Sequence, residues 1–460
     1  MKHLKSILTK QSVWMCSLLL ALTLVGCNSG NELELPVVDP GTPFSSSATL
    51  TVSNFLPRSG SLGTRLILYG NNFGNDTARV QVTIGGQPAR VLSTRGESLL
   101  CVVPSKAYDG DIQVSVVDDG GNVLQQATCD SLFTYTYNMV VSTFLGQTYD
   151  SNTKHDIKAG PFEDCGGFDN LIWMKFDPNN PDMLYIAAGK KSFRSVDFQN
   201  RYVDIFNTNL NQPTSIDFTL EGDMVVSDDQ PSDTKTGIYI FTRESGYTIR
   251  REVCNAKEVN SVAVHPIDGC IYYTIYRNGQ MWKFDPLANE QSLVRDMPYS
   301  REMYYMFWHP TGKYCYVVFH QRHAIWRMDY DMATETLGTP YLVCGQVGSS
   351  GYQDAVGTSV RLAKPAQGVF VKNKDYAGQD DEYDFYFCDS NNHCIRFLTP
   401  EGRVETYAGR AENSSGYRDG ELRTQAQFNL PESIVYDEQR QCFYVGDNNN
   451  HYIRKIAPEE

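Results

Sequence analysis

The 460-residue sequence has little that would favour helices, nucleic-acid binding or anionic membranes. Long periodic stretches of Ala, Leu, Glu and Lys are missing, whereas 28 Tyr and 22 Phe are present, which favours an all-β protein. Because 54 acidic residues outnumber 40 basic ones, the net charge of −14 argues against binding to a nucleic-acid backbone or an anionic lipid surface. The acidic balance is compatible with neutral ligands such as sugars, although it identifies none of them.

The sequence also has no familiar catalytic or metal-binding motif. It contains no Gly-x-Ser-x-Gly elbow, no phosphate-binding loop and no Cys/His spacing typical of zinc. Of its twelve cysteines, Cys16 and Cys27 belong to an export segment, and several others fall inside strand-like runs, where buried free thiols are expected. Cys101 and Cys129 could instead pair within one small domain. We predict no cofactor and no metal.

The most apolar run lies at the N-terminus. Basic residues between Lys2 and Lys10 precede an apolar run over residues 13–25, which is too short for a comfortable membrane span. The run ends in Leu-Val-Gly-Cys, which resembles the bacterial lipobox. This resemblance implies a signal peptide over residues 1–26 and lipidation of Cys27 at the outer membrane, facing the cell exterior; an ordinary signal peptide is the alternative. Residues 27–47 are rich in Pro, Ser, Gly and Glu, which predicts a flexible tether.

Residues 48–137 contain six or seven alternating strands separated by Gly, Asn and Asp turns, which is typical of a small β-sandwich. The segment Leu-Tyr-Gly-Asn-Asn-Phe-Gly at 68–74, Val103-Pro104 and Phe133-Thr134-Tyr135 occur in the order that resembles the IPT/TIG immunoglobulin-like domain. In that family the domain is usually a spacer or an interaction module, and the resemblance brings no catalytic residue.

A unit of short strands recurs through residues 138–460. The first strands of successive units are entered near Leu171, Pro213, Val259, Met303, Pro365 and Pro431. A period of roughly 40–50 residues with four strands per repeat is typical of a β-propeller blade, and the two longest intervals carry insertions. The pattern predicts an all-β chain whose C-terminal domain is a six-bladed propeller.

The two ends of this region predict how the ring closes. The chain ends after the third strand of its last unit, whereas Val140–Gly146 has the pattern of a fourth strand with no first three before it. The simplest solution is that this N-terminal strand completes the C-terminal blade. Such closure removes the free sheet edges that favour aggregation.

The last repeats carry Asp-x-x-Asn-His turns that end at His393 and His451 and resemble the NHL family. The first three repeats have lost the Asn-His pair. Asp and Asn side chains that bond nearby backbone amides explain such turns without a ligand, so both histidines are predicted to be structural. His265 and His309 are predicted to be structural as well. No three-histidine constellation matches the NHL-type lyases that hold zinc in their channel.

One face of the propeller is predicted to carry a ligand site, because the residues entering every innermost strand converge around the mouth of the channel. Aromatic rings can cover the apolar face of a sugar, while amides and carboxylates bind its hydroxyls. The alternative is that these aromatic side chains pack between blades. The candidate residues at the mouth are Trp173, Asn260, Tyr304, Tyr305, Gln367 and Glu432, with Tyr352, Asp354, Tyr417 and Asp419 on the two insertions.

The lipid anchor, the IPT/TIG module and the NHL-type propeller together resemble accessory surface lipoproteins of glycan-utilisation systems in Gram-negative bacteria. The resemblance implies a non-catalytic protein that captures polysaccharide or oligosaccharide and passes it to an outer-membrane transporter and enzymes. One alternative is a scaffold whose propeller binds partner lipoproteins. A second is a polysaccharide lyase or glycoside hydrolase; a hydrolase would need two facing carboxylates, and Glu432 is the only one predicted at the mouth itself.

Overall fold

The computed structural model describes residues 40–104, 107, 109–146, 158–187, 192–207, 209–410 and 413–459. The predicted signal peptide, the lipidation site Cys27 and the tether up to residue 39 lie outside these residues. Within them, the structure contains no helix that is both long and apolar enough to cross a membrane. The chain divides into two compact units, Met1–Thr136 and Tyr137–Glu460.

The first unit is an all-β domain with a seven-stranded sheet, a two-stranded sheet and one core. The strands alternate between buried and exposed residues, so that each presents one face to a core that includes Phe55, Leu68, Phe73 and Val114. Cys101 and Cys129 are both buried free thiols in this core. The hydrogen-bonded order is β1 (Thr51–Leu56), β3 (Arg65–Asn71), β6 (Ser98–Val102), β5 (Gln87–Thr94), β4 (Val80–Ile84), β7 (Ile112–Val117) and β8 (Val123–Thr128), with β2 (Ser59–Gly60) parallel to β9 (Thr134–Tyr135).

Residues 40–47, which were predicted as the end of the flexible tether, are held against this domain. The backbone amide of Ser45 donates to the Asn72 side-chain oxygen at 2.8 Å, and the Asn72 side chain donates back to the Ser45 carbonyl at 2.8 Å. Phe44 packs against the core. The sequence prediction is therefore corrected for these residues, because a buried asparagine and an aromatic anchor fix their path.

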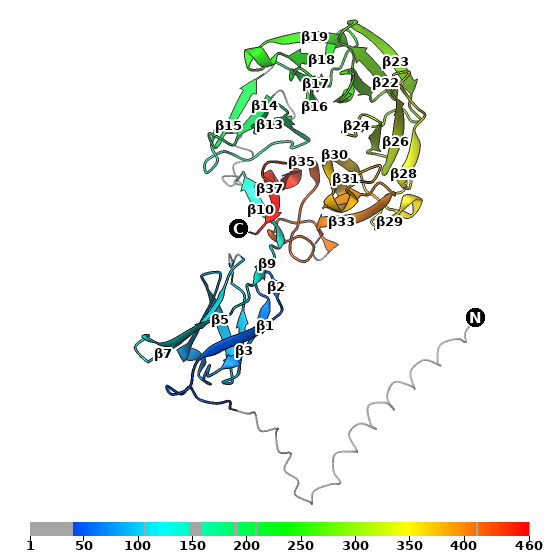
Figure 1. The fold of residues 1–460 in the computed structure, drawn as a ribbon. Coiled ribbons are helices and arrows are strands. Elements are labelled where there is room, and N and C mark those ends of the chain that lie inside the picture. Colours follow the sequence, from blue (N-terminus) through cyan, green and yellow to red (C-terminus); the bar gives the residue numbers. More distant parts are fainter. Residues whose placement is uncertain are drawn as a thin grey trace, which may run out of the picture. The chain divides into compact units, whose positions relative to one another are not determined.

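The second unit is a six-bladed propeller, in which each blade is an antiparallel sheet (Figure 1). The second strands of several blades are buried along their whole length because neighbouring blades cover both faces, whereas the outermost strand of blade three is mostly exposed. Blades one to three, from the innermost strand outward, are β12 (Trp173–Asp177), β13 (Asn180–Ala187), β14 (Ser192–Asp197), β15 (Tyr202–Asn207) and β11 (Gly160–Pro161); β16 (Pro213–Phe218), β17 (Met224–Asp228), β18 (Thr236–Phe241) and β19 (Arg250–Asn255); and β20 (Val259–Val264), β21 (Ile271–Ile275), β22 (Gln280–Asp285) and β23 (Glu290–Asp296).

The last three blades contain additional short strands. Blade four is β24 (Tyr304–Trp308), β25 (Tyr314–Phe319), β26 (Ala324–Asp331) and β28 (Tyr341–Gly345), with β27 (Thr336–Leu337) on β26. Blade five is β30 (Pro365–Lys372), β31 (Tyr383–Asp389), β32 (Cys394–Leu398), β33 (Arg403–Gly409) and β29 (Ala355–Val356). Blade six is β35 (Pro431–Asp437), β36 (Cys442–Asp447), β37 (Tyr452–Pro458), β10 (Met139–Leu145) and β34 (Gly420–Glu421).

The ring is closed by the N-terminal strand of the propeller, as the sequence predicted. Strand β10 lies beside β37 (Figure 1). The two strands pair antiparallel, and Val141 lies opposite Ile456. Val141 is buried in a core cluster with Phe443 and Ile456, and Leu145 is buried in the cluster that joins blade six to blade one. The prediction of a six-bladed propeller closed by an N-terminal strand is confirmed.

The contribution of this closure can be tested by truncating its buried side chains. Val141→Ala and Leu145→Ala each leave a cavity beside blade six, so each is expected to lower the free energy of unfolding of the propeller by about 1–4 kcal/mol. Intrinsic fluorescence during urea unfolding measures this unit, because all four tryptophans of the described residues lie within it.

Leu293→Ala is the matched control, because Leu293 lies on the outermost strand of blade three and is 45% exposed. Its effect on the free energy of unfolding is expected to stay within about 0.5 kcal/mol. Equal unfolding midpoints for Leu145→Ala and Leu293→Ala would contradict the role given to β10.

Candidate functional site

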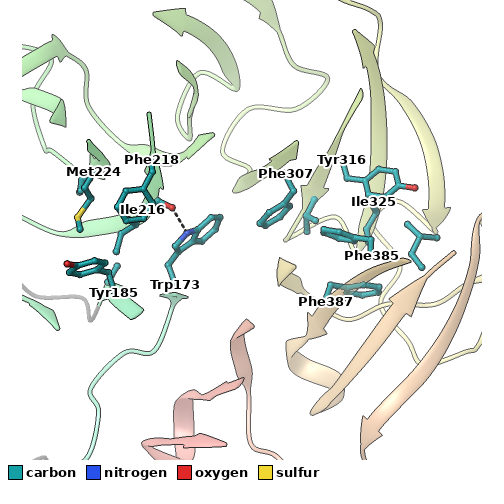
Figure 2. Packing of buried hydrophobic residues seen from close by; sticks show 14 of the residues in the cluster. Trp173, Tyr185, Ile216, Phe218, Met224, Phe307, Tyr316, Ile325, Phe385 and Phe387 are labelled. Atoms are coloured by element: carbon teal, nitrogen blue, oxygen red, sulfur yellow. Dashed lines mark hydrogen bonds between the residues drawn. The ribbon is translucent and has the colours of Figure 1, made fainter. Parts of the chain in front are cut away.

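The centre of the channel is filled by side chains that cross from one blade to another. Trp173 of blade one is buried, its indole stacks on Phe307 of blade four at a centroid distance of 5.4 Å and an angle of 10°, and its Nε1 donates to the Ile216 carbonyl at 2.9 Å (Figure 2). Blades one and four lie on opposite sides of the ring of six blades. The stacked pair therefore spans the channel and blocks it. Trp173 therefore forms part of the propeller core.

Gln367 of blade five has a similar bridging role. Its side-chain oxygen accepts from the backbone amides of Met174, at 3.0 Å, and Ile434, at 3.3 Å, and its side-chain nitrogen donates to the Met174 carbonyl at 2.7 Å. One amide thus links blades one, five and six. Trp173 and Gln367 line a cavity of about 440 Å³ that extends to the Pro266 and Pro310 end of the channel, away from the predicted mouth.

The predicted mouth is a separate hollow of about 220 Å³, to which all six blades contribute. It adjoins a second hollow of about 480 Å³ that also includes Asp229, Asn260 and Met303. We call these two hollows together the mouth. The first is lined by Ile172, Gln212, Thr214, Asp229, Asn260, Met303, Tyr305, His320, Ala366 and Glu432, and the second adds Asn211, Gln230, Pro231, Glu258 and Tyr276.

Irregularities in the strand ladders decide which side chains face the mouth. The register shifts between Pro213 and Ser215, between Val259 and Ser261, and between Pro431 and Ser433. The additional residue in each case, Thr214, Asn260 or Glu432, lines the mouth. A bulge turns a side chain out of the regular alternation, so these three shifts aim polar groups into the hollow.

Blade four lacks this irregularity, and as a result the two tyrosines predicted at the mouth, Tyr304 and Tyr305, face different surroundings. Its ladder is continuous from Tyr304, which pairs with Phe319, to Trp308. Tyr304 is fully buried, its ring packs edge-on against Phe319 at 4.8 Å, and its hydroxyl donates to the Tyr299 carbonyl. Tyr305 alone lines the mouth, where its ring also lies 5.9 Å from that of Trp173. The structure therefore brings only the second tyrosine to the candidate site.

The predicted residues on the first insertion brace the blades. Asp354 accepts from Arg396 at 2.7 Å and from the Thr406 backbone amide at 3.1 Å, and Arg396 also pairs with the buried Asp389 at 2.9 Å. The Tyr352 hydroxyl bonds the Thr406 hydroxyl at 2.8 Å. The insertion is thus fixed to the third and fourth strands of blade five.

The second insertion repeats this arrangement on blade six. Asp419 accepts from Arg454 and from the Thr143 backbone amide, and the Tyr417 hydroxyl bonds the Thr143 hydroxyl at 2.6 Å. Arg454 also pairs with the buried Asp447 at 2.8 Å. None of the four insertion residues lines the mouth, and their hydrogen bonds account for the repeated Tyr-x-Asp pattern.

The histidine side chains of the Asn-His turns form hydrogen bonds with the backbone that enters the next blade. His393 and His451 adopt left-handed conformations, with φ of 56° and 63°, which end the short turns before the third strands. His393 Nδ1 accepts from the Leu430 amide at 3.1 Å, and His451 Nδ1 donates to the Phe168 carbonyl at 2.9 Å. Among the described residues, no group of three or more His, Cys, Asp and Glu side chains is placed to hold a metal ion.

The mouth is acidic and partly shielded from water. Burial raises the pKa of Glu432 to about 6, although Asn448 and Lys364 act in the opposite direction. Burial, with Glu258 and Asp228 nearby, raises the pKa of Asp229 to about 6. His320 has a pKa lowered by burial to about 4, so its ring is neutral at physiological pH. The site therefore combines two carboxylates of raised pKa with an uncharged imidazole.

Sequence reasoning did not identify Asp229 as a mouth residue. It follows Asp228, the last residue of β17, which occupies the ladder position of Asp389 and Asp447 in blades five and six. The turn after that position lies on the mouth face in every blade, so the ladder position of Asp228 was a usable signal. It was obscured because blade two lacks the Asn-His pair.

The ionisation of Glu432 predicts a pH-dependent stability. Because its pKa rises from 4.5 to about 6 on folding, the folded state binds the proton more tightly and loses stability as the pH rises through this interval. Ionisation of the Glu432 carboxylate then lowers the free energy of unfolding by about 2 kcal/mol. Glu432→Gln is expected to raise the free energy of unfolding by up to about this amount at pH 8 and by much less at pH 5.

Urea unfolding at the two pH values measures the effect, and Glu290→Gln on the exposed strand β23 is the control. The control removes the same charge at the surface and should change little at either pH. An equal loss of stability at both pH values in Glu432→Gln would show that its carboxylate is not destabilised by burial.

Comparison with known proteins agrees with the two-unit architecture. The family model for the IPT/TIG domain matches residues 50–137, so the first unit is an immunoglobulin-like domain of that family. No curated protein matches the chain. The solved structure of an auxiliary nutrient binding protein from Bacteroides ovatus is 53% identical, with a TM-score of 0.77 and a match that covers 91% of this chain and 100% of that one.

Two proteins from Bacteroides thetaiotaomicron are also similar over their whole length. An auxiliary nutrient binding protein is 45% identical, with a TM-score of 0.81 and coverage of 91% of this chain and 100% of that one. A putative phosphatase is 34% identical, with a TM-score of 0.78 and coverage of 92% of this chain and 100% of that one. The chain therefore belongs to the family of these Bacteroides proteins.

Proposed function

We propose that the protein captures a carbohydrate nutrient, a polysaccharide or an oligosaccharide, at the mouth of the propeller and does not transform it. Two relatives that match this chain over their full length are auxiliary nutrient binding proteins, which supports a nutrient-binding role. The observation that carries the proposal is the mouth itself. All six blades contribute to one hollow that combines a tyrosine ring with amide and carboxylate groups.

The chemistry of the mouth suits a sugar. The ring of Tyr305 offers an apolar surface, and Asn260, Asp229 and Glu432 offer oxygen atoms that accept hydrogen bonds from hydroxyls. The stacked Trp173–Phe307 pair blocks the channel beyond Tyr305, so the mouth is a blind hollow. A single unit of a long chain can enter it while neighbouring units remain outside.

The N-terminal segment supplies the proposed location. Lipidation at Cys27 would anchor the protein to the outer membrane, and the mouth would face the cell exterior. An IPT/TIG module between the anchor and the propeller suits a spacer. In this arrangement the captured glycan passes to an outer-membrane transporter and to partner lipoproteins.

The mouth is less suited to a phosphate ester, even though one relative is a putative phosphatase. Asp229, Glu258 and Glu432 carry negative charge and repel a phosphate group. The lining residues suit a glycoside hydrolase better than a phosphatase, because two carboxylates, Asp229 and Glu432, line one hollow. Release of sugar ends during incubation with a glycan would distinguish a hydrolase from a binding protein.

Carbohydrate capture is testable by electrophoresis in native gels that contain a panel of polysaccharides. At least one glycan is expected to retard the protein, and Tyr305→Ala is expected to weaken binding by about two- to tenfold, since one packed aromatic ring contributes about 0.5–1.5 kcal/mol. Tyr417→Phe is the matched control: it removes the hydroxyl bonded to Thr143 outside the mouth and should leave retardation unchanged.

Two outcomes contradict the proposal. If no glycan retards the protein and other membrane proteins co-purify with it, the propeller is a scaffold. If reducing or unsaturated ends appear during incubation and Glu432→Gln abolishes their release, the protein is an enzyme.

A further inference from the structure

The charges around the mouth are unbalanced. Three carboxylates line it, from Asp229, Glu258 and Glu432, whereas no Lys or Arg side chain is among its described lining residues. Arg277 reaches Glu258 at 2.6 Å from outside the hollow, and Lys364 acts on Glu432 without lining the mouth. The charged groups that raise the pKa of Asp229, Asp228 and Glu258, are both acidic.

Two uncharged side chains of the mouth also offer acceptors. The Asn260 side-chain oxygen is buried and has no hydrogen-bond partner among the described residues, although the residue is only 7% exposed and lines both hollows. His320 Nδ1 contacts the Pro365 carbonyl at 3.0 Å. Because a carbonyl can only accept, Nδ1 carries the hydrogen, and Nε2 of the neutral ring is left as an acceptor.

Of the three hydroxyl groups among the described residues that line the mouth, those of Thr214 and Tyr305 have partners within the protein, and that of Tyr276 is the third. The Thr214 hydroxyl lies 2.7 Å from that of Ser227 and donates to the Val259 carbonyl at 3.1 Å. The Tyr305 hydroxyl contacts the Met303 sulfur at 3.3 Å. A ligand that enters the mouth therefore meets several acceptors, among them three carboxylates with no cation in the described lining, and a ligand that supplies donors and positive charge suits it.

We propose that the ligand carries a protonated amine, as a polysaccharide with free 2-amino sugars does, and that its ammonium group lies among Asp229, Glu432 and Asn260. This inference rests on the proposed function, because it names the class of glycan that the same mouth takes. An ammonium group supplies three donors and one positive charge, which matches the acceptors and compensates the carboxylates. A neutral sugar supplies donors but leaves the charge uncompensated.

Three tetrasaccharides with the same β-1,4-linked backbone isolate the group at carbon 2. Cellotetraose carries a hydroxyl there, the glucosamine tetramer carries an ammonium group, and the N-acetylglucosamine tetramer carries an acetamide. Calorimetry on the full chain at pH 6.5 is expected to show that the glucosamine tetramer binds at least tenfold more tightly than the other two. The difference should shrink as salt is raised from 0.05 to 0.5 M, since ions screen the attraction.

The net charge of −14 attracts any cation weakly. Variants distinguish this general attraction from binding at the mouth. Asp229→Asn and Glu432→Gln are each expected to reduce the preference for the amine by fivefold or more. Glu290→Gln removes one charge from the exposed strand β23 and should leave the preference intact. Thermal unfolding of each variant confirms that it folds. If Asp229→Asn does not fold, Glu432→Gln alone is enough to test the inference.

The inference and the proposed function fail in different ways. If cellotetraose or the acetylated tetramer binds as tightly as the amine, or if only other neutral glycans retard the protein, the inference is overturned and carbohydrate capture stands. If spermine binds at the mouth as tightly as the glucosamine tetramer, the amine is recognised without a sugar and the inference is overturned. If no glycan binds at all, both fail.

Discussion

The pairing of β10 with β37 is the constraint on which the candidate site depends. These strands lie more than 300 residues apart in the chain, and their ladder turns a row of blades into a ring. The mouth exists only in the closed ring, because its first hollow takes one or more lining residues from every blade. Closure also buries Val141 and Leu145, so the energy that stabilises the fold and the geometry that forms the site have one source.

Contacts across the channel determine what kind of hollow the ring encloses. An open channel would let a ligand pass, but the stacked rings of Trp173 and Phe307 and the three-blade link of Gln367 fill its centre. The aromatic and amide groups that sequence reasoning assigned to ligand binding thus divide into two sets. Some pack within the channel or the blades and do not line the mouth, while Asn260, Tyr305 and Glu432 line it.

Much of the architecture could be predicted because it follows from periodicity, whereas the site depends on local exceptions to periodicity. The repeat length and the unmatched strand at residues 140–146 were enough to predict six blades and their closure. Which residue of a pair faces the mouth is decided by a bulge, present at Glu432 and absent at Tyr304, and alternation alone does not encode it. The insertion residues Asp354 and Asp419 bind arginines from strands that sequence spacing does not place beside them.

The carboxylates of the mouth differ in their partners from the carboxylates buried in the blades. Asp389 and Asp447 are buried carboxylates, and each pairs with an arginine and accepts backbone hydrogen bonds, as a structural acid should. Glu432 and Asp229 are also partly withdrawn from water, yet no arginine pairs with either among the described residues. A partly buried carboxylate without an arginine partner destabilises the folded chain, and a bound ligand that supplies charge and donors would offset this cost. A stabilising role therefore explains the first pair of acids, and the proposed ligand would explain the second.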